Sequence, residues 1–331
     1  MPIHSFPVAE IHGRTTKIKR YYWRELLKRE LELYGEWAAV HGVNPLIASD
    51  DAANAARQSA AEQALQEVKR LHETNPKYTF IPEPSQADII SECDVEVVSL
   101  QAMYVSDPAN RRVRLMWQDQ AINVEDFAQL HFRNEGYDSI ALESIPFHVL
   151  FGIFMWPVIQ DPDDERLEVC CFGDRQAYND GEAGEIIRCH KPDDFGKPGY
   201  AKRRKEAIEE HFFESVDADN LEWLFEYWLE PSEKLRQYLW AHRAADIEKA
   251  QRLIRILPGE VLIAILRYLV DSYWERYLGW PDLLIFRDDD YFFAEVKSSK
   301  DKLSIEQKRW ISDNHKALKL PFKLVKIHKL R

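Results

Sequence analysis

The chain has 331 residues, of which 45% are hydrophobic and 12% aromatic, so it is long enough for one large domain or two and can bury a core. This composition excludes an intrinsically disordered chain, and no apolar run is long enough to cross a bilayer. The net charge of −12 argues against a general nucleic-acid coat protein.

The first residues and the cysteine content indicate the compartment. Residues 1–20 contain no apolar signal core, and the chain has four cysteines, so a reducing cytoplasm is expected. The cysteines lie near one histidine, which could suggest zinc. However, Cys170 and Cys171 are adjacent, and neither has the usual two-residue spacing to Cys189 or His190, so free thiols are expected.

Residues 1–122 are predicted to be mostly helical and contain no pattern that assigns a function. Residues 21–40 repeat aromatic and leucine positions with charges between them, as an amphipathic helix does. Ser49 or Asp50 is expected to cap a second helix. Two strands are expected between residues 95 and 118.

The next stretch predicts two helices and one unusual carboxylate. The first helix begins at Asn123 or Val124, and the second lies within residues 137–159, where it is apolar nearly all round and therefore buried. Glu143 stands at or just before its start, since Pro146 fits a first helical turn. A carboxylate there is either stabilised by the helix dipole or needs a partner or a metal.

A basic segment opens the predicted helical region that follows. Lys202, Arg203 and Arg204 lie at its start, where they either contact a DNA backbone or form a solvated helix end. Further helices are expected from Glu222 to Ala250 and up to Gly279.

Residues 279–310 predict a strand, a tight turn, a strand and a helix. Side chains alternate along a strand, so Glu295 and Lys297 point the same way, and antiparallel pairing would bring Asp282 beside Glu295. Two adjacent carboxylates repel each other, and a divalent cation removes that cost and activates its bound water. The alternative is a surface hairpin with an ordinary salt bridge.

The predicted final helix and strand form a basic end. Ser304 and Gln307 have capping-box spacing, although Gln307 could instead contact a metal-bound water or the scissile phosphate. From residue 291 onward there are eleven Lys and Arg against four Asp and Glu, a charge of +7, so the first 290 residues carry −19. Lys300 and Lys302 in this basic end are candidate DNA contacts; a solvated terminus is the alternative.

Two motifs resemble known nucleases. The order PDL, EVK, DKLS, Q and W between Pro281 and Trp310 resembles the VRR-Nuc branch of the PD-(D/E)-x-K nucleases. Upstream, the order ES, LFG and MW beginning at Glu143 is similar to a helix of the Fanconi-associated nuclease family. Here Ser144 replaces the usual glycine and Pro157 the usual aspartate.

This resemblance implies an α/β fold with a restriction-endonuclease-like core, in which helices flank a mixed sheet. It implies a helical N-terminal region, residues 1–122, and a nuclease domain, residues 123–331, with a helical insertion at about 200–278. Homodimerisation, as in compact VRR-Nuc proteins, is a further possibility.

The resemblance also implies Mg²⁺- or Mn²⁺-dependent hydrolysis of phosphodiester bonds in DNA, with flaps, junctions or 5′ ends as substrates in repair or recombination. The protein would act in the cytoplasm, at the nucleoid when it binds DNA. A nuclease of a defence or mobile-element system and a degenerate DNA-binding module are the alternatives. The metal ligands would be Glu143, Asp282, Glu295 and the Val296 carbonyl, and the catalytic residues Asp282, Glu295, Lys297 and Gln307.

Overall fold

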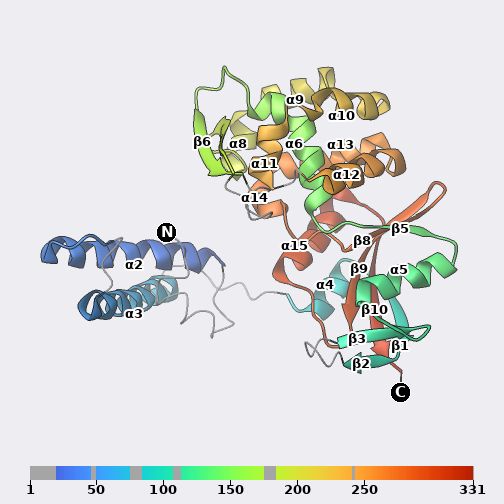
Figure 1. Cartoon of the computed structure of the whole chain (residues 1–331), viewed down its shortest axis with the longest axis horizontal. Helices are drawn as coiled ribbons and strands as arrows, with labels where there is room; N and C mark the ends of the chain where they lie inside the picture. The colour runs from blue at the N-terminus through green and yellow to red at the C-terminus, as the bar shows by residue number, and fades with distance from the viewer. Residues whose placement is uncertain are drawn as a thin grey trace. The chain divides into compact units, whose positions relative to one another are not determined.

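The structure, a computed structural model, forms two compact units, Met1–Pro82 and Glu83–Arg331 (Figure 1). None of the helices in its described part is both long and apolar enough to span a membrane. The described residues are 20–45, 50–74, 84–106, 113–174, 184–240 and 243–330.

The first unit is a pair of helices, α2 (Arg20–His41) and α3 (Asp51–Thr74), as predicted. Leu26 of α2 packs with apolar residues of α3, and Arg29 Nε donates to Glu67 Oε2 at 2.6 Å. The cap of α3 is Asp50, whose Oδ1 accepts the amide of Ala53 at 2.7 Å. Ser49, the other candidate cap, lies outside the described residues.

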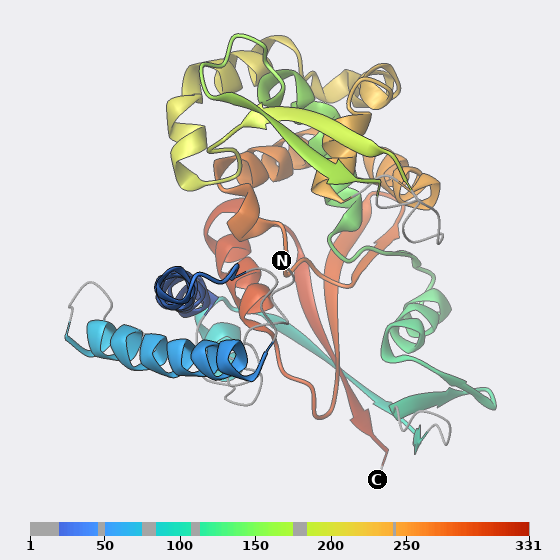
Figure 2. The ribbon, with the colours of Figure 1, turned by 60° about the vertical axis from the view of Figure 1, so that its left-hand side comes forward.

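The second unit is organised around a five-stranded mixed sheet with the order β1-β10-β9-β8-β5 (Figure 2). β1 (Glu96–Ala102) and β10 (Phe322–Lys329) are parallel to β9 (Asp290–Ser298). β8 (Leu283–Arg287) pairs antiparallel with β9 and with β5 (Asp138–Ala141). The predicted β8–β9 hairpin is therefore confirmed, and the mixed α/β class with it.

Two of these strands were not predicted as parts of the core sheet. β5 lies just before the predicted helix, and α6 starts at Ile145 with Pro146 in its first turn, as predicted. β1, from the predicted N-terminal region, pairs with β10, and the compact unit that holds the sheet is Glu83–Arg331.

Helices, a small three-stranded sheet and a two-stranded hairpin complete the second unit. They are α4 (Gln86–Glu92), β2 (Tyr104–Ser106), β3 (Val113–Trp117), β4 (Gln120–Ile122), α5 (Val124–Asn134), α6 (Ile145–Ile159), β6 (Leu167–Gly173), β7 (Ile186–Pro192), α8 (Pro198–Arg203), α9 (Lys205–Glu214), η3 (Ala218–Asn220), α10 (Leu221–Leu229), α11 (Glu233–Leu239), α12 (Ala244–Ile256), α13 (Gly259–Asp271), α14 (Tyr273–Arg276), α15 (Ile305–Asp313) and η4 (Asn314–Leu318).

The two faces of the sheet bury different clusters. Phe292 and Ala294 belong to the cluster that contains Phe127 of α5, whereas Phe293 packs near Trp310 of α15, with ring centroids 6.3 Å apart. α5 and α15 accordingly lie on opposite sides of the sheet (Figures 1 and 2). Since side chains alternate along β9, its odd-numbered residues face α15.

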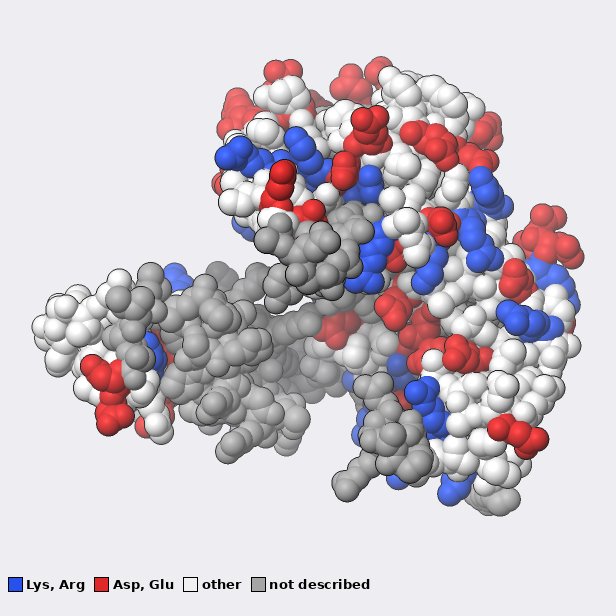
Figure 3. Space-filling model, viewed as in Figure 1, with Lys and Arg blue, Asp and Glu red and all other residues white. Residues whose placement is uncertain are grey.

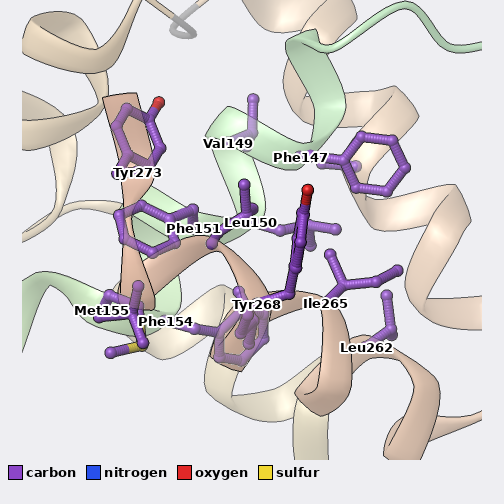
Figure 4. Close-up of a cluster of buried hydrophobic side chains, with 14 of the residues drawn as sticks. Phe147, Val149, Leu150, Phe151, Phe154, Met155, Leu262, Ile265, Tyr268 and Tyr273 are labelled. Carbon is purple, nitrogen blue, oxygen red and sulfur yellow. The ribbon is translucent and has the colours of Figure 1, made fainter. Parts of the chain in front are cut away.

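α6 is the core of the helical part, as its all-round apolar sequence predicts (Figure 4). Phe154 meets Trp228 of α10 edge-on, and Phe151 stacks on Tyr273 of α14 with centroids 4.6 Å apart. Gly152 allows α11 to approach, because a Cβ at this position would lie 2.6 Å from Arg236 Cγ. Cys170 and Cys171 lie within β6.

Candidate active site

The β8–β9 hairpin places Asp282 at one end of the sheet. The ladder begins with Leu283 opposite Ala294, so Asp282 falls opposite Glu295 just outside it. The amide of Val296 donates a hydrogen bond to Asp282 Oδ2 at 2.8 Å. Val296 lies beyond the end of the β8–β9 ladder, so this side chain replaces the missing backbone acceptor. Since the N–H and C=O of a strand residue point to the same side, the Val296 carbonyl also faces Asp282.

Glu295 is the best-buried carboxylate of the site, with 1% of its surface exposed. Lys297 Nζ and Gln307 Nε2 both donate to its Oε1. The structure thus brings together Asp282, Glu295, Lys297 and Gln307, the four residues that the sequence predicted to be catalytic.

Burial controls the charge of this acid pair. It raises the pKa of Asp282, and it raises the pKa of Glu295 to about 8, an increase to which the negative charge of Asp282 also contributes. Lys297 opposes both shifts. At neutral pH Glu295 therefore keeps most of its proton, which a divalent cation would displace. When both acids are ionised, Lys297 balances only one of the two negative charges. Carboxylate oxygens in such a site suit Mg²⁺ or Mn²⁺.

Gln307 forms the predicted capping box and also contacts Glu295, a partner that the sequence did not indicate. Its Oε1 accepts the amide of Ser304 at 2.9 Å in a capping box that starts α15, while its Nε2 reaches Glu295. Gly279 makes this approach possible. Its φ is +88°, and a Cβ on it would lie 2.3 Å from the backbone of Glu306, so only glycine lets α15 pack here.

Trp280 fixes the PD motif to the surrounding helices. It is 4% exposed and stacks on Phe147 of α6, with centroids 4.0 Å apart and ring planes at 27°. Its Nε1 donates to the Arg276 carbonyl at 3.0 Å, and its ring lies 5.6 Å from that of Trp310. Asp282 is therefore two residues from a rigid anchor.

Glu143 lies beside this network without joining it. The amide of Leu142 donates to the Asp282 carbonyl at 2.8 Å, so β5 delivers Glu143 to the end of the sheet that carries the acids. Glu143 is exposed and has a φ of +50°. Among the described residues, no hydrogen bond or ion pair joins it to Asp282 or Glu295, and no group of three His, Cys, Asp or Glu is placed to hold a metal. Its role as a ligand stays a prediction.

Glu125 is a nearby acid that the sequence did not single out. It lies in the first turn of α5, where burial raises its pKa; Asp282 raises it further and Lys297 lowers it. It therefore shares the electrostatic field of the acid pair. In the sequence, Glu125 follows the Asn123 cap, and an acid at that position is common in the first turn of any helix. The sequence therefore did not mark it as a site residue.

The candidate DNA contacts fall into two groups. Arg203 bridges Asp164 and Asp194 at 2.8 and 2.7 Å, and Arg204 pairs with Asp161 at 2.6 Å, so both guanidinium groups hold α8 to the preceding loops. Lys202, Lys300 and Lys302 are exposed, and the last two lie in the loop between β9 and α15, a few residues from Lys297.

Residues 217–325 match the VRR-NUC domain. The chain is 28% identical over 202 residues to the Fanconi-associated nuclease 1 homolog of Caenorhabditis elegans, which covers 59% of this chain and 22% of that protein. It is 26% identical over 201 residues to Fanconi-associated nuclease 1 of Homo sapiens, covering 59% and 18%. The chain thus spans about a fifth of the length of these relatives.

A solved structure shows the same fold. The crystal structure of paFAN1 bound to 5′-flap DNA with a two-nucleotide flap and a gap aligns with a TM-score of 0.51 and 16% identity, covering 99% of this chain and 52% of that one. Residues 217–325 therefore match a VRR-NUC domain, within a chain whose fold is similar to that of paFAN1. It is distantly related to Fanconi-associated nuclease 1.

Proposed function

We propose that this chain is a divalent-metal-dependent phosphodiesterase that cleaves DNA with a flap, a junction or a free 5′ end, in repair or recombination. The observation that carries this proposal is the pair of facing acids, half-buried Asp282 and buried Glu295, with Lys297 bonded to Glu295. A structural salt bridge would not require a second buried acid, whereas metal-assisted hydrolysis does require such donors.

The two carboxylates and the Val296 carbonyl would hold the cation, with Glu143 as the further donor that the sequence predicts. When bound, the cation supplies Lewis acidity and an activated water. Lys297 would orient that water and stabilise the negative charge that develops on the phosphate. Gln307 would fix the rotamer of Glu295 by holding its Oε1, so that the other oxygen remains available.

The surface supports a substrate that is recognised by its shape. On the face shown in Figure 3, acidic side chains cover much of the outer helices, and lysines and arginines lie among them. Such a surface binds duplex phosphates weakly through charge alone. We propose that Lys202, Lys300 and Lys302 contact phosphates locally. A 5′ flap is the DNA bound in the structure of paFAN1.

Asp282→Ala is expected to lower cleavage of a 5′-flap substrate in Mn²⁺ by at least about 10²-fold, because the variant loses both a metal oxygen and the acceptor for the Val296 amide. Initial rates on flap, nicked and linear duplexes measure this. Asp289→Ala in the exposed β8–β9 turn is the matched control. Equal rates for the two variants would remove Asp282 from the reaction.

A further inference from the structure

A second feature adjoins the acid pair: a pocket of about 470 Å³ between the start of α6, the end of α11 and α14. This volume lies in the range of pockets that hold small organic groups. Four of its ten lining residues are Trp or Tyr, three are aliphatic, and the others are Glu, Ser and His. The lining residues are Glu143, Ser144, Ile145, His148, Tyr238, Leu239, Trp240, Trp274, Tyr277 and Leu278.

The aromatic walls are held in place by their neighbours. Trp274 Nε1 donates to the Phe195 carbonyl at 3.1 Å, and its ring meets Tyr277 and Tyr238 edge-on, at 5.4 and 5.9 Å. Trp240 is 64% exposed and has a φ of +104°, a conformation that bulky residues rarely adopt. Backbone strain of this kind is concentrated at functional sites.

The charges of the pocket disfavour a phosphate as its occupant. Among the described residues, those that line the pocket include no Lys or Arg, and Glu143 is acidic. His148 accepts from or donates to the Tyr273 hydroxyl at 2.8 Å, and burial lowers its pKa to about 4, so it is neutral at pH 7. A flat, uncharged ring with hydrogen-bonding groups on its edge matches these walls, and a nucleobase is such a group.

The position of the pocket relates it to the acid pair. Glu143 lines the pocket, and the amide of its neighbour Leu142 donates to the Asp282 carbonyl. On the other side, Tyr277 and Leu278 lead directly into Gly279 and the PD motif. A base held here would therefore belong to a nucleotide close to the phosphate that the acid pair addresses.

We propose that this aromatic pocket receives one unpaired base of the DNA substrate, taken out of the base stack and held against Trp240, Trp274 and Tyr277. The inference rests on the proposed function and adds how the branch is recognised. Stacking is tolerant of base identity, so the pocket would select an unpaired nucleotide rather than a sequence. An end or flap supplies such a base at little cost, whereas a continuous duplex must first be unpaired.

The test is a binding measurement without metal, so that no cleavage occurs. A 5′-flap DNA carries 2-aminopurine at successive flap positions, and its fluorescence is recorded with the full chain in EDTA. We expect quenching at one position with the wild type and with Trp240→Phe. Trp240→Ala should abolish this quenching and weaken flap binding about tenfold, the loss expected for one stacked base.

Trp223→Ala is the matched control, because Trp223 is 62% exposed, stacks on Tyr227 in α10 and lies outside the pocket. Thermal melts verify that each variant is folded. If Trp240→Ala behaves as Trp223→Ala does at every position, while the wild type binds and cleaves the flap, the pocket proposal is wrong and the proposed function stands. If the wild type neither binds nor cleaves the flap, both fail.

Discussion

Lys297→Ala should reduce flap cleavage by about 10²–10³-fold while Mn²⁺ binding is retained, because the lysine acts on the reacting phosphate and water rather than on the metal. Its side chain is 13% exposed and its ammonium group is bonded to Glu295, so it lies inside the site. Its removal takes away a positive charge that opposes cation binding, so the metal affinity should not fall.

Single-turnover cleavage rates and Mn²⁺ titrations of the same protein samples separate these effects. Lys329→Ala, an exposed lysine at the end of β10, serves as the control for a general loss of charge. A Lys297→Ala variant that cleaves as fast as the wild type would show that the lysine is only a structural partner of Glu295.

Glu295→Gln should abolish cleavage and yet stabilise the metal-free protein at pH 8. The pKa of Glu295 is raised from 4.5 to about 8, so its folded state keeps a proton that the unfolded chain has released. This contribution to stability is complete below pH 4.5 and is lost as the pH rises through about 8. Glutamine keeps the shape and removes the charge.

Thermal melts in EDTA between pH 5 and pH 9 measure this effect. We expect the Tm of the wild type to fall across that range relative to Glu295→Gln, with a difference of roughly 5 °C at pH 8, corresponding to about 2 kcal/mol. Added Mn²⁺ should raise the Tm of the wild type more at pH 8 than at pH 6, since binding displaces the proton. A pH-independent difference would contradict the buried acid pair.

The parts of the site that the sequence predicts are those set by local rules. Alternation along one strand places Glu295 and Lys297 on the same face, and a tight turn sets Asp282 opposite Glu295. The capping-box spacing identifies the start of α15 at Ser304. These features depend on residues that are close in sequence.

Contacts between distant segments could not be predicted in this way. β5 is a four-residue strand that pairs with the edge of β8, and four residues are too few for a clear strand pattern in the sequence. Glu125 approaches Asp282 only because α5 packs on the sheet. The aromatic pocket likewise joins α6, α11 and α14, and its tyrosines and tryptophans have the ordinary sequence signal of a core.

Glu143 shows both the value and the limit of a family resemblance. The family motif indicated Glu143 as a site residue. In the structure it is adjacent to Leu142, whose amide donates to the Asp282 carbonyl. Its carboxylate is exposed at the rim of the aromatic pocket rather than bonded to the acid pair. A side-chain orientation depends on what is bound, which no spacing pattern encodes.

The central claim is that the buried Asp282–Glu295 pair binds the cation that cleaves DNA, and Mn²⁺ titration monitored by electron paramagnetic resonance at pH 8 tests it most directly. We predict one tight Mn²⁺ per wild-type chain, retained in Asp289→Ala and lost in both Asp282→Ala and Glu295→Gln, together with flap cleavage. Unchanged Mn²⁺ binding in Glu295→Gln, with cleavage intact, would contradict the claim.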